Sequence, residues 1–99
     1  MKLRIGKRAQ REAARAEAWW GTNRPASPHL FTRELEETFA HICAVPGAGV
    51  PWPTAARPSL RRILMPRARN HVYFRVDARA QVVHVMAIWG APRGTAPKL

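Results

Sequence analysis

Three short segments between residues 60 and 89 read as β-strands, and the middle one alternates apolar and polar side chains with the two-residue period of a strand. They cover residues 60–65, 71–76 and 81–89. A four-residue polar turn, residues 77–80, separates the last two segments, and such spacing predicts an antiparallel pair. The pattern therefore predicts that this part of the chain forms an antiparallel sheet from strands that follow one another in sequence.

The first third of the chain has a different period. Residues 8–20 contain no glycine or proline and are rich in alanine, which favours a helix. Ala9, Ala13, Ala16 and Trp20 recur at helical spacing and are predicted to form its packed face. The stretch from Gly21 to Pro25 is predicted to end this helix.

A second helix is predicted to begin at Ser27 and Pro28, a typical N-cap and first-turn pair, and to end before Pro46. Its apolar stripe consists of Phe31, Leu35, Phe39 and Ile42. The default interpretation of both stripes is that the two helices pack on each other and on the sheet.

A short alternating segment around Leu3 and Ile5 adds a strand before the helices, so the predicted order is β-α-α-β-β-β. This order indicates an α+β fold, a helical hairpin packed on an antiparallel sheet. The 99 residues suffice for a single domain, residues 1–99. Residues 46–59 are expected to form an irregular proline-rich connection, and residues 90–99 a loosely ordered tail.

The chain is strongly basic, with 17 lysines and arginines, 6 acidic residues and a net charge of +11. Asp77 is the sole acidic residue after position 38, so most of the excess charge lies in the second part of the chain. Such a charge favours contact with a polyanion or an acidic protein. The cations are mostly arginines, whose planar fork matches phosphate and carboxylate groups.

Several classes of protein do not fit the sequence. Cys43 is the only cysteine, so there is no intramolecular disulfide or thiolate metal cluster, and it is predicted to be a small buried side chain. We expect neither a metal site nor a cofactor. The N-terminal residues lack the apolar stretch of a signal peptide, and no apolar run is long enough to span a membrane. A cytoplasmic location without membrane contact is therefore expected.

Three motifs in the strand region have a recognisable order and spacing. They are Arg61-Arg62-Ile63-Leu64-Met65-Pro66, His71-Val72-Tyr73-Phe74-Arg75-Val76-Asp77 and Ala87-Ile88-Trp89-Gly90-Ala91-Pro92-Arg93-Gly94. Earlier features agree with them: Trp19-Trp20, Asn23, Pro25 and Leu30-Phe31. Together they resemble the RelE/ParE superfamily of toxins, and most closely its ParE-type members.

This resemblance implies a growth-inhibiting, cytoplasmic toxin of a type II toxin–antitoxin system, of the kind associated with plasmid stabilisation. Its partner would be a cognate antitoxin that neutralises it in a hetero-oligomer, by wrapping it with a segment that is often disordered when free. Folding of an acidic segment on this basic domain agrees with the charge balance. A groove beside the helical hairpin and an exposed sheet edge are the expected docking places. The hairpin residues Trp19, Trp20, Phe31 and Leu35 are the predicted antitoxin contacts.

The superfamily contains two activities. ParE-type members inhibit DNA gyrase without being nucleases, whereas RelE-type members are endoribonucleases that cleave mRNA on the ribosome. The nuclease members resemble one another in placing an arginine near the start of the strand where this sequence has His71, and a tyrosine near the C-terminus. Here no tyrosine follows Tyr73. The resemblance therefore favours gyrase inhibition, with the ribosome and mRNA as the alternative target.

A nuclease would need a base, an acid and cations around the reacting phosphate. The parts available for it are His71, Tyr73, Arg61, Arg62 and His84, together with Arg93. Arg61 and Arg62 should point to opposite faces of their strand. For a toxin that only binds its target, we predict that Arg61, Arg62, Arg75 and Arg93 form the contact. A plain nucleic-acid-binding module is a third interpretation, which is disfavoured because the aromatic residues other than Tyr73 fall on apparent core faces.

Overall fold

The computed structural model describes the whole chain except the side chain of Arg93. Its elements are β1 (Lys2–Ile5), α1 (Lys7–Asn23), α2 (Leu30–Ala44), β2 (Val50–Pro51), β3 (Arg61–Met65), β4 (Asn70–Asp77), β5 (Val82–Gly90) and the 3-10 helix Ala91–Arg93. The predicted order of strand, two helices and three strands is confirmed. The structure adds β2, a two-residue strand within the segment that was predicted to be an irregular proline-rich connection.

The sheet has five strands in the order β1-β5-β4-β3-β2, and it is mixed rather than wholly antiparallel. The three strands β3, β4 and β5 pair antiparallel as predicted, but β1 pairs parallel with β5. A parallel neighbour needs a long crossover connection. The helical hairpin begins directly after β1 and, with β2 to β4, fills the chain between the two strands.

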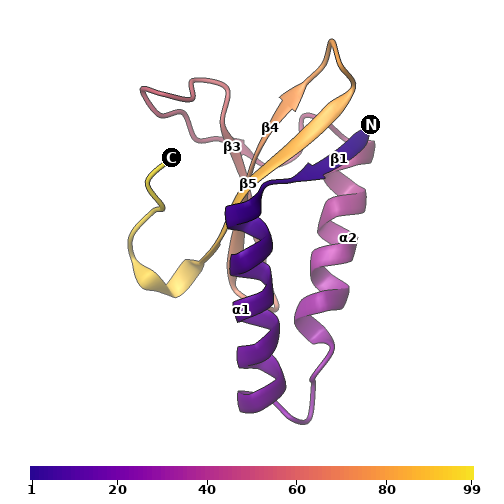
Figure 1. Ribbon diagram of the computed structural model, residues 1–99, viewed down its shortest axis with the longest axis vertical. Helices are drawn as coiled ribbons and strands as arrows, with labels where there is room; N and C mark the ends of the chain where they lie inside the picture. The colour runs from indigo at the N-terminus through magenta and orange to yellow at the C-terminus, as the bar shows by residue number, and fades with distance from the viewer.

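The two helices run side by side and cover one face of the sheet (Figure 1). This helix face carries the main core, where Ala9 of α1 and Phe31 and Ile42 of α2 pack with Val72 and Val83 of the sheet. The apolar stripes of both predicted helices thus point inward. Helix α1 continues through Gly21 to Asn23, past the predicted end, and α2 begins after His29 rather than at Ser27.

Glu34 lies in this core, although its acidic side chain places it off the predicted apolar stripe. Its side chain is 6% exposed and accepts two backbone hydrogen bonds, from the N–H of Arg67 at 3.0 Å and of Ala68 at 2.7 Å. Both donors belong to the β3–β4 turn. A buried carboxylate must be hydrogen-bonded to be tolerated, and Glu34 meets this need by fixing the turn to helix α2.

A β-bulge in β5 changes which of its residues face the helices. The register runs from Tyr73 opposite Ala87 to Phe74 opposite Val85, so Met86 is the extra residue. Simple alternation placed Ala87 on the same face as Val85. The bulge instead puts Ile88 in the main core with Val85, while Ala87 joins a second cluster on the opposite, outer face. Alternation cannot show such a shift, because one inserted residue reverses the facing of those that follow.

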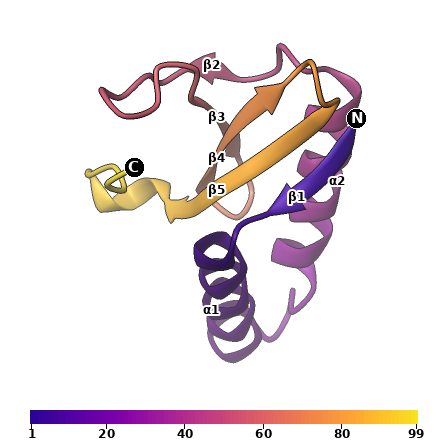
Figure 2. The same ribbon diagram turned by 45° about the horizontal axis from the view of Figure 1, so that its top comes forward.

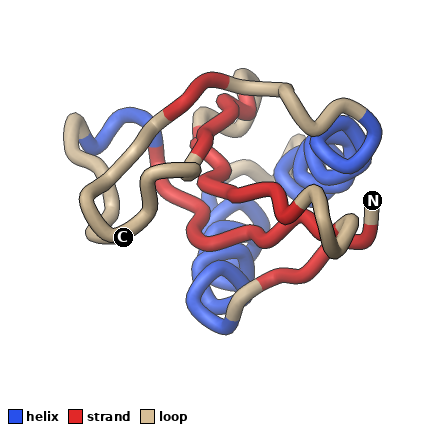
Figure 3. Tube along the Cα trace, turned by 90° about the horizontal axis from the view of Figure 1, so that it is seen from above, coloured by secondary structure: helices blue, strands red, loops and turns tan.

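The outer face is covered in part by the β2–β3 connection and the C-terminal segment, which lie together at one side of the molecule (Figures 2 and 3). Leu99 packs against the buried side chains of Leu60, Tyr73 and Ala87. Three hydrogen bonds hold the segment: Thr54 Oγ1 donates to the Leu99 carbonyl at 3.1 Å, an Arg8 nitrogen to that of Lys98 at 2.8 Å, and Trp89 Nε1 to that of Thr95 at 3.0 Å.

Gly49 connects the end of α2 to strand β2 with a φ of 73°. A Cβ at this position would collide with the backbone carbonyl of Arg62. We therefore expect Gly49→Ala to lower the free energy of unfolding by about 2–4 kcal/mol, because strain in the left-handed region adds to a backbone clash. Urea denaturation checks this value. Gly47→Ala is the control, since open space surrounds Gly47, and equal losses in the two variants would contradict the prediction.

Candidate interaction groove and outer sheet face

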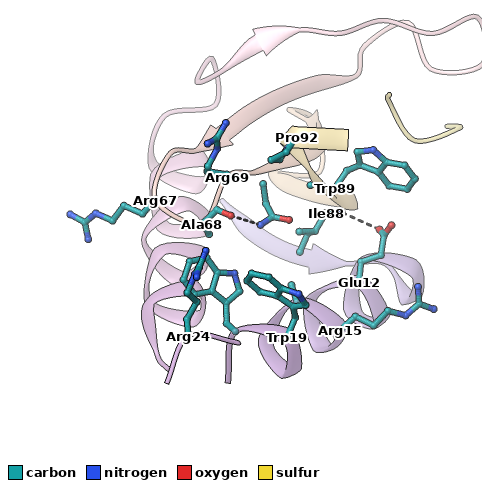
Figure 4. A pocket seen from close by; sticks show the side chains of 14 residues that line it. Glu12, Arg15, Trp19, Arg24, Arg67, Ala68, Arg69, Ile88, Trp89 and Pro92 are labelled. Atoms are coloured by element: carbon teal, nitrogen blue, oxygen red, sulfur yellow. Dashed lines mark hydrogen bonds between the residues drawn. The ribbon is translucent and has the colours of Figure 1, made fainter. Parts of the chain in front are cut away.

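A groove of about 710 Å³ lies between helix α1 and the end of the sheet (Figure 4). One wall comes from α1, and the other from the β3–β4 turn and the end of β5. The lining residues are Glu12, Arg15, Ala16, Trp19, Trp20, Arg24, Arg67, Ala68, Arg69, Asn70, Ile88, Trp89, Gly90 and Pro92. Indoles and arginines dominate this lining.

Helix α1 positions the aromatic part of the groove. Trp19 is 49% exposed, and its ring lies edge-on to that of Trp20 with 5.6 Å between the centroids. The Arg24 guanidinium lies 5.7 Å from the Trp19 ring centroid, a distance that allows a cation–π contact. An exposed indole beside a cation offers both apolar area and charge to a ligand.

The charge of the groove is positive. Arg15, Arg24, Arg67 and Arg69 line it, and Glu12 is its one acidic lining residue. The Glu12 carboxylate is already engaged, because it accepts the Ile88 N–H at 3.0 Å and pairs with Arg8 at 3.5 Å. Figure 4 shows Arg15 and Arg67 pointing outward at opposite sides of the groove. The arrangement suits an anionic ligand with apolar side chains.

The four predicted antitoxin contacts separate into two groups. Trp19 and Trp20 line the groove, as expected for a docking site. Phe31 is 1% exposed and belongs to the core, and Leu35 is partly buried against the same core. These two side chains stabilise the hairpin. A helical stripe cannot show by itself which of its members stay accessible.

On the outer face, Arg62 is surrounded by aromatic groups. Its guanidinium lies 3.5 Å from the centroid of the Trp52 ring, and one of its nitrogens donates to the Tyr73 hydroxyl at 3.4 Å. The imidazole of His71 lies edge-on to the Tyr73 ring, with centroids 6.2 Å apart. Burial, and secondarily the positive charge of Arg62, lowers the pKa of His71 below 6.5. His71 is therefore mostly neutral at pH 7.

Arg61 points to the other side, as its position next to Arg62 predicted. Its guanidinium donates to three backbone carbonyls, those of Gly47 at 2.8 Å, Ala48 at 3.1 Å and Gly49 at 3.2 Å. These bonds fix the loop that follows α2. Arg61 therefore has a structural role that competes with any contact to a target.

The remaining predicted site residues are spread over the sheet. Arg75 and His84 are cross-strand neighbours on the outer face, and Arg75 follows Tyr73 by two residues on the same face of β4. The side chain of Arg93 lies outside the described part of the chain. Of the five residues offered for a nuclease, His71, Tyr73 and Arg62 are in contact with one another through Tyr73, whereas Arg61 points to the opposite face.

The residues of this cluster that could act as acid or base are poorly accessible to a substrate. Tyr73 is 1% exposed, and its hydroxyl is held by Arg62. His71 is partly buried, and Arg62 stacks on Trp52. Among the described residues, no group of three or more His, Cys, Asp or Glu side chains is arranged to hold a metal ion. The cluster as folded can present a cation and an indole but not a free hydroxyl.

Several functional candidates are not visible in the sequence. The groove arginines Arg15, Arg24, Arg67 and Arg69 come from two segments far apart in sequence, and only the crossover of β1 and α1 onto β5 brings them together. Trp52, 37% exposed, lies in the irregular connection, so the expectation that the aromatic residues other than Tyr73 are core residues is wrong for Trp52 and Trp19. The two prolines next to Trp52 were the sequence feature that could have indicated its position in an exposed loop.

Comparison with known proteins identifies the fold. The sequence matches no protein-family model and no curated protein. Among solved structures, the chain is similar to one from the chromosomal ParDE TA system of P. aeruginosa, with a TM-score of 0.70 and 18% identity over 91% of this chain and 95% of the other. It is also similar to the YoeB/ParE toxin of Agrobacterium tumefaciens, with a TM-score of 0.62 and 16% identity over 91% and 98%. The chain thus has the RelE/ParE toxin fold that its motifs predicted.

Within the described residues, no helix combines the length and the apolar character needed to cross a bilayer.

Proposed function

We propose that this chain is the toxin of a type II toxin–antitoxin system and that it inhibits DNA gyrase by binding it. Two solved structures with the same fold come from a ParDE TA system and a YoeB/ParE toxin, and this likeness supports the toxin role. The observation that carries the gyrase assignment is that two residues offered for RNA cleavage are not free to act on a substrate. Tyr73 is buried, and Arg61 is bonded to three carbonyls.

The groove supports the antitoxin as the second partner. Four arginines and the exposed Trp19 surround it, and the carboxylate of Glu12 is occupied by internal bonds. An amphipathic acidic segment would place its apolar side chains on the indoles and its carboxylates opposite the arginines. An arginine-lined groove of this kind suits an acidic segment that folds on binding. We place the antitoxin contact at Trp19 and Trp20.

Substitutions of His71 and Tyr73 distinguish a protein that inhibits gyrase by binding from one that cleaves RNA. We expect the double variant His71→Ala/Tyr73→Phe to inhibit gyrase supercoiling within about threefold of the unaltered protein. Loss of the 3.4 Å bond between Tyr73 and Arg62 costs only about 1 kcal/mol of stability. Removing an acid or base from a nuclease lowers its rate by roughly 10²–10⁴-fold. Gel assays of plasmid supercoiling and of mRNA cleavage on ribosomes measure both quantities with the same preparations.

One observation favours the alternative of a ribosome-dependent endoribonuclease. The neutral His71, the Tyr73 hydroxyl and the Arg62 cation share one patch of the outer face, and they are a base, an acid and a charged group. Cleavage would require the β2–β3 connection or the C-terminal segment to move off Tyr73. Ribosome-bound mRNA that is cleaved by the unaltered protein but not by the double variant would overturn the gyrase assignment.

A further inference from the structure

We propose that a row of polar side chains on the outer sheet face, Arg4, His84 and Arg75, two of them arginines, binds the phosphodiester backbone of duplex DNA. This inference goes beyond the proposed function, because it gives the chain a direct contact with nucleic acid that neither antitoxin binding nor gyrase binding requires. We name these three residues the polar row.

The register of the sheet places the row. Arg4 of β1 is opposite His84 of β5, and His84 is opposite Arg75 of β4. Directly opposed residues point to the same face of a sheet. The chain neighbours of all three, such as Leu3, Val83 and Phe74, pack in the core on the helix face. The polar row therefore points outward, on the face that the helices do not cover.

No ion pair involves the row in the part of the chain that the structure describes. The ion pair found there joins Arg8 to Glu12, and neither residue belongs to the row. Asp77 follows Arg75 by two residues on the same face of β4, and its carboxylate accepts the Ala80 N–H at 3.0 Å. The two arginines of the row can therefore form charge-assisted hydrogen bonds with an external anion.

Spacing and chemistry favour phosphate over a carboxylate surface. Neighbouring strands lie about 4.8 Å apart, so the row spans roughly 10 Å from β1 to β4. One strand of duplex DNA carries a phosphate for about every 3.4 Å of axis, so the two arginines at the ends of the row can reach different phosphates of one strand. Arginine at both ends supplies planar donors for phosphate oxygens, and the sheet holds them at fixed positions.

Salt-dependent binding tests the proposal with the full chain and a 12-base-pair DNA duplex of mixed sequence. The unaltered protein is compared with Arg4→Gln/Arg75→Gln by fluorescence anisotropy over a range of salt concentrations. Each lost phosphate contact lowers the slope of log affinity against log salt by about 0.9, so the variant should lose about 1.8. The matched control is Arg11→Gln/Arg33→Gln, which removes the same charge from exposed positions on α1 and α2.

We expect the control to keep a slope within about 0.5 of the unaltered protein, because distant charges make no phosphate contact. Equal losses in both variants would show that only net charge acts, and would overturn the proposal. Tighter binding of a poly-glutamate peptide than of DNA, lost on Arg4→Gln/Arg75→Gln, would also overturn it, since the partner would then be an acidic protein. The assay contains no gyrase, so its outcome is separate from that of the supercoiling assay.

Discussion

Glu34→Ala is expected to lower the free energy of unfolding by about 3–4 kcal/mol. The substitution leaves two backbone N–H groups, those of Arg67 and Ala68, without their acceptor. Hydrogen bonds to a charged group contribute about 1.5–3 kcal/mol each, and buried donors without a partner carry a desolvation cost. The loss is a large part of the stability of a small domain. Urea denaturation followed by circular dichroism measures it.

Glu37→Ala is the matched control, because Glu37 is an exposed acidic residue of the same helix. It should change stability by less than about 0.5 kcal/mol. Glu34→Gln keeps one carbonyl oxygen as an acceptor, so its loss should lie between those of the two alanine variants. Similar stabilities for Glu34→Ala and Glu37→Ala would mean that the β3–β4 turn does not depend on this contact.

Charge reversal in the groove should weaken antitoxin binding by about 100-fold. In Arg24→Glu/Arg69→Glu, two cations on opposite walls become anions that face the carboxylates of an acidic segment. Placing like charges together in an interface costs several kcal/mol, and 100-fold in Kd corresponds to about 2.7 kcal/mol. Titration calorimetry with the proposed antitoxin measures the Kd.

The control for this prediction is Arg11→Glu/Arg79→Glu, which makes the same change in net charge at exposed positions outside the groove. Its Kd should rise by less than about tenfold, since long-range charge is screened at physiological salt. If both variants lose the same affinity, the groove is not the docking site. If neither loses affinity, the antitoxin uses another surface of the toxin.

Local pattern predicted much of the fold. Alternation in residues 71–76, and the turn after them, located β4 and its antiparallel neighbour within about a residue. The helical stripes likewise identified the faces that pack, including Phe31 and Ile42. These features depend on periods of two and 3.6 residues, which a sequence displays directly.

Other features depend on contacts between distant segments. The parallel pairing of β1 with β5 and the bulge at Met86 depend on how the strands assemble into one sheet against the helical hairpin. Glu34 appeared as one of several polar residues on the exposed side of a helix, and its burial follows from the position of the β3–β4 turn. A tertiary partner decides such cases, and local propensity does not encode it.

The candidate site was predicted only in part. Trp19 and Trp20 were recognised because they are part of the motifs that resemble the toxin superfamily. The groove arginines were not recognised, because only folding brings them into one groove. Arg61 and Arg62 were correctly expected to point to opposite faces. No local pattern indicated that Arg61 holds a loop through three carbonyls while Arg62 stacks on Trp52.

Inhibition of purified gyrase is the most direct test of the central claim. The purified chain is titrated into a DNA supercoiling assay, with and without an excess of the proposed antitoxin. We predict that supercoiling stops as the chain approaches the concentration of gyrase and recovers when the antitoxin is added. Supercoiling that continues at a large excess of the chain, together with cleavage of mRNA on ribosomes, would contradict the account.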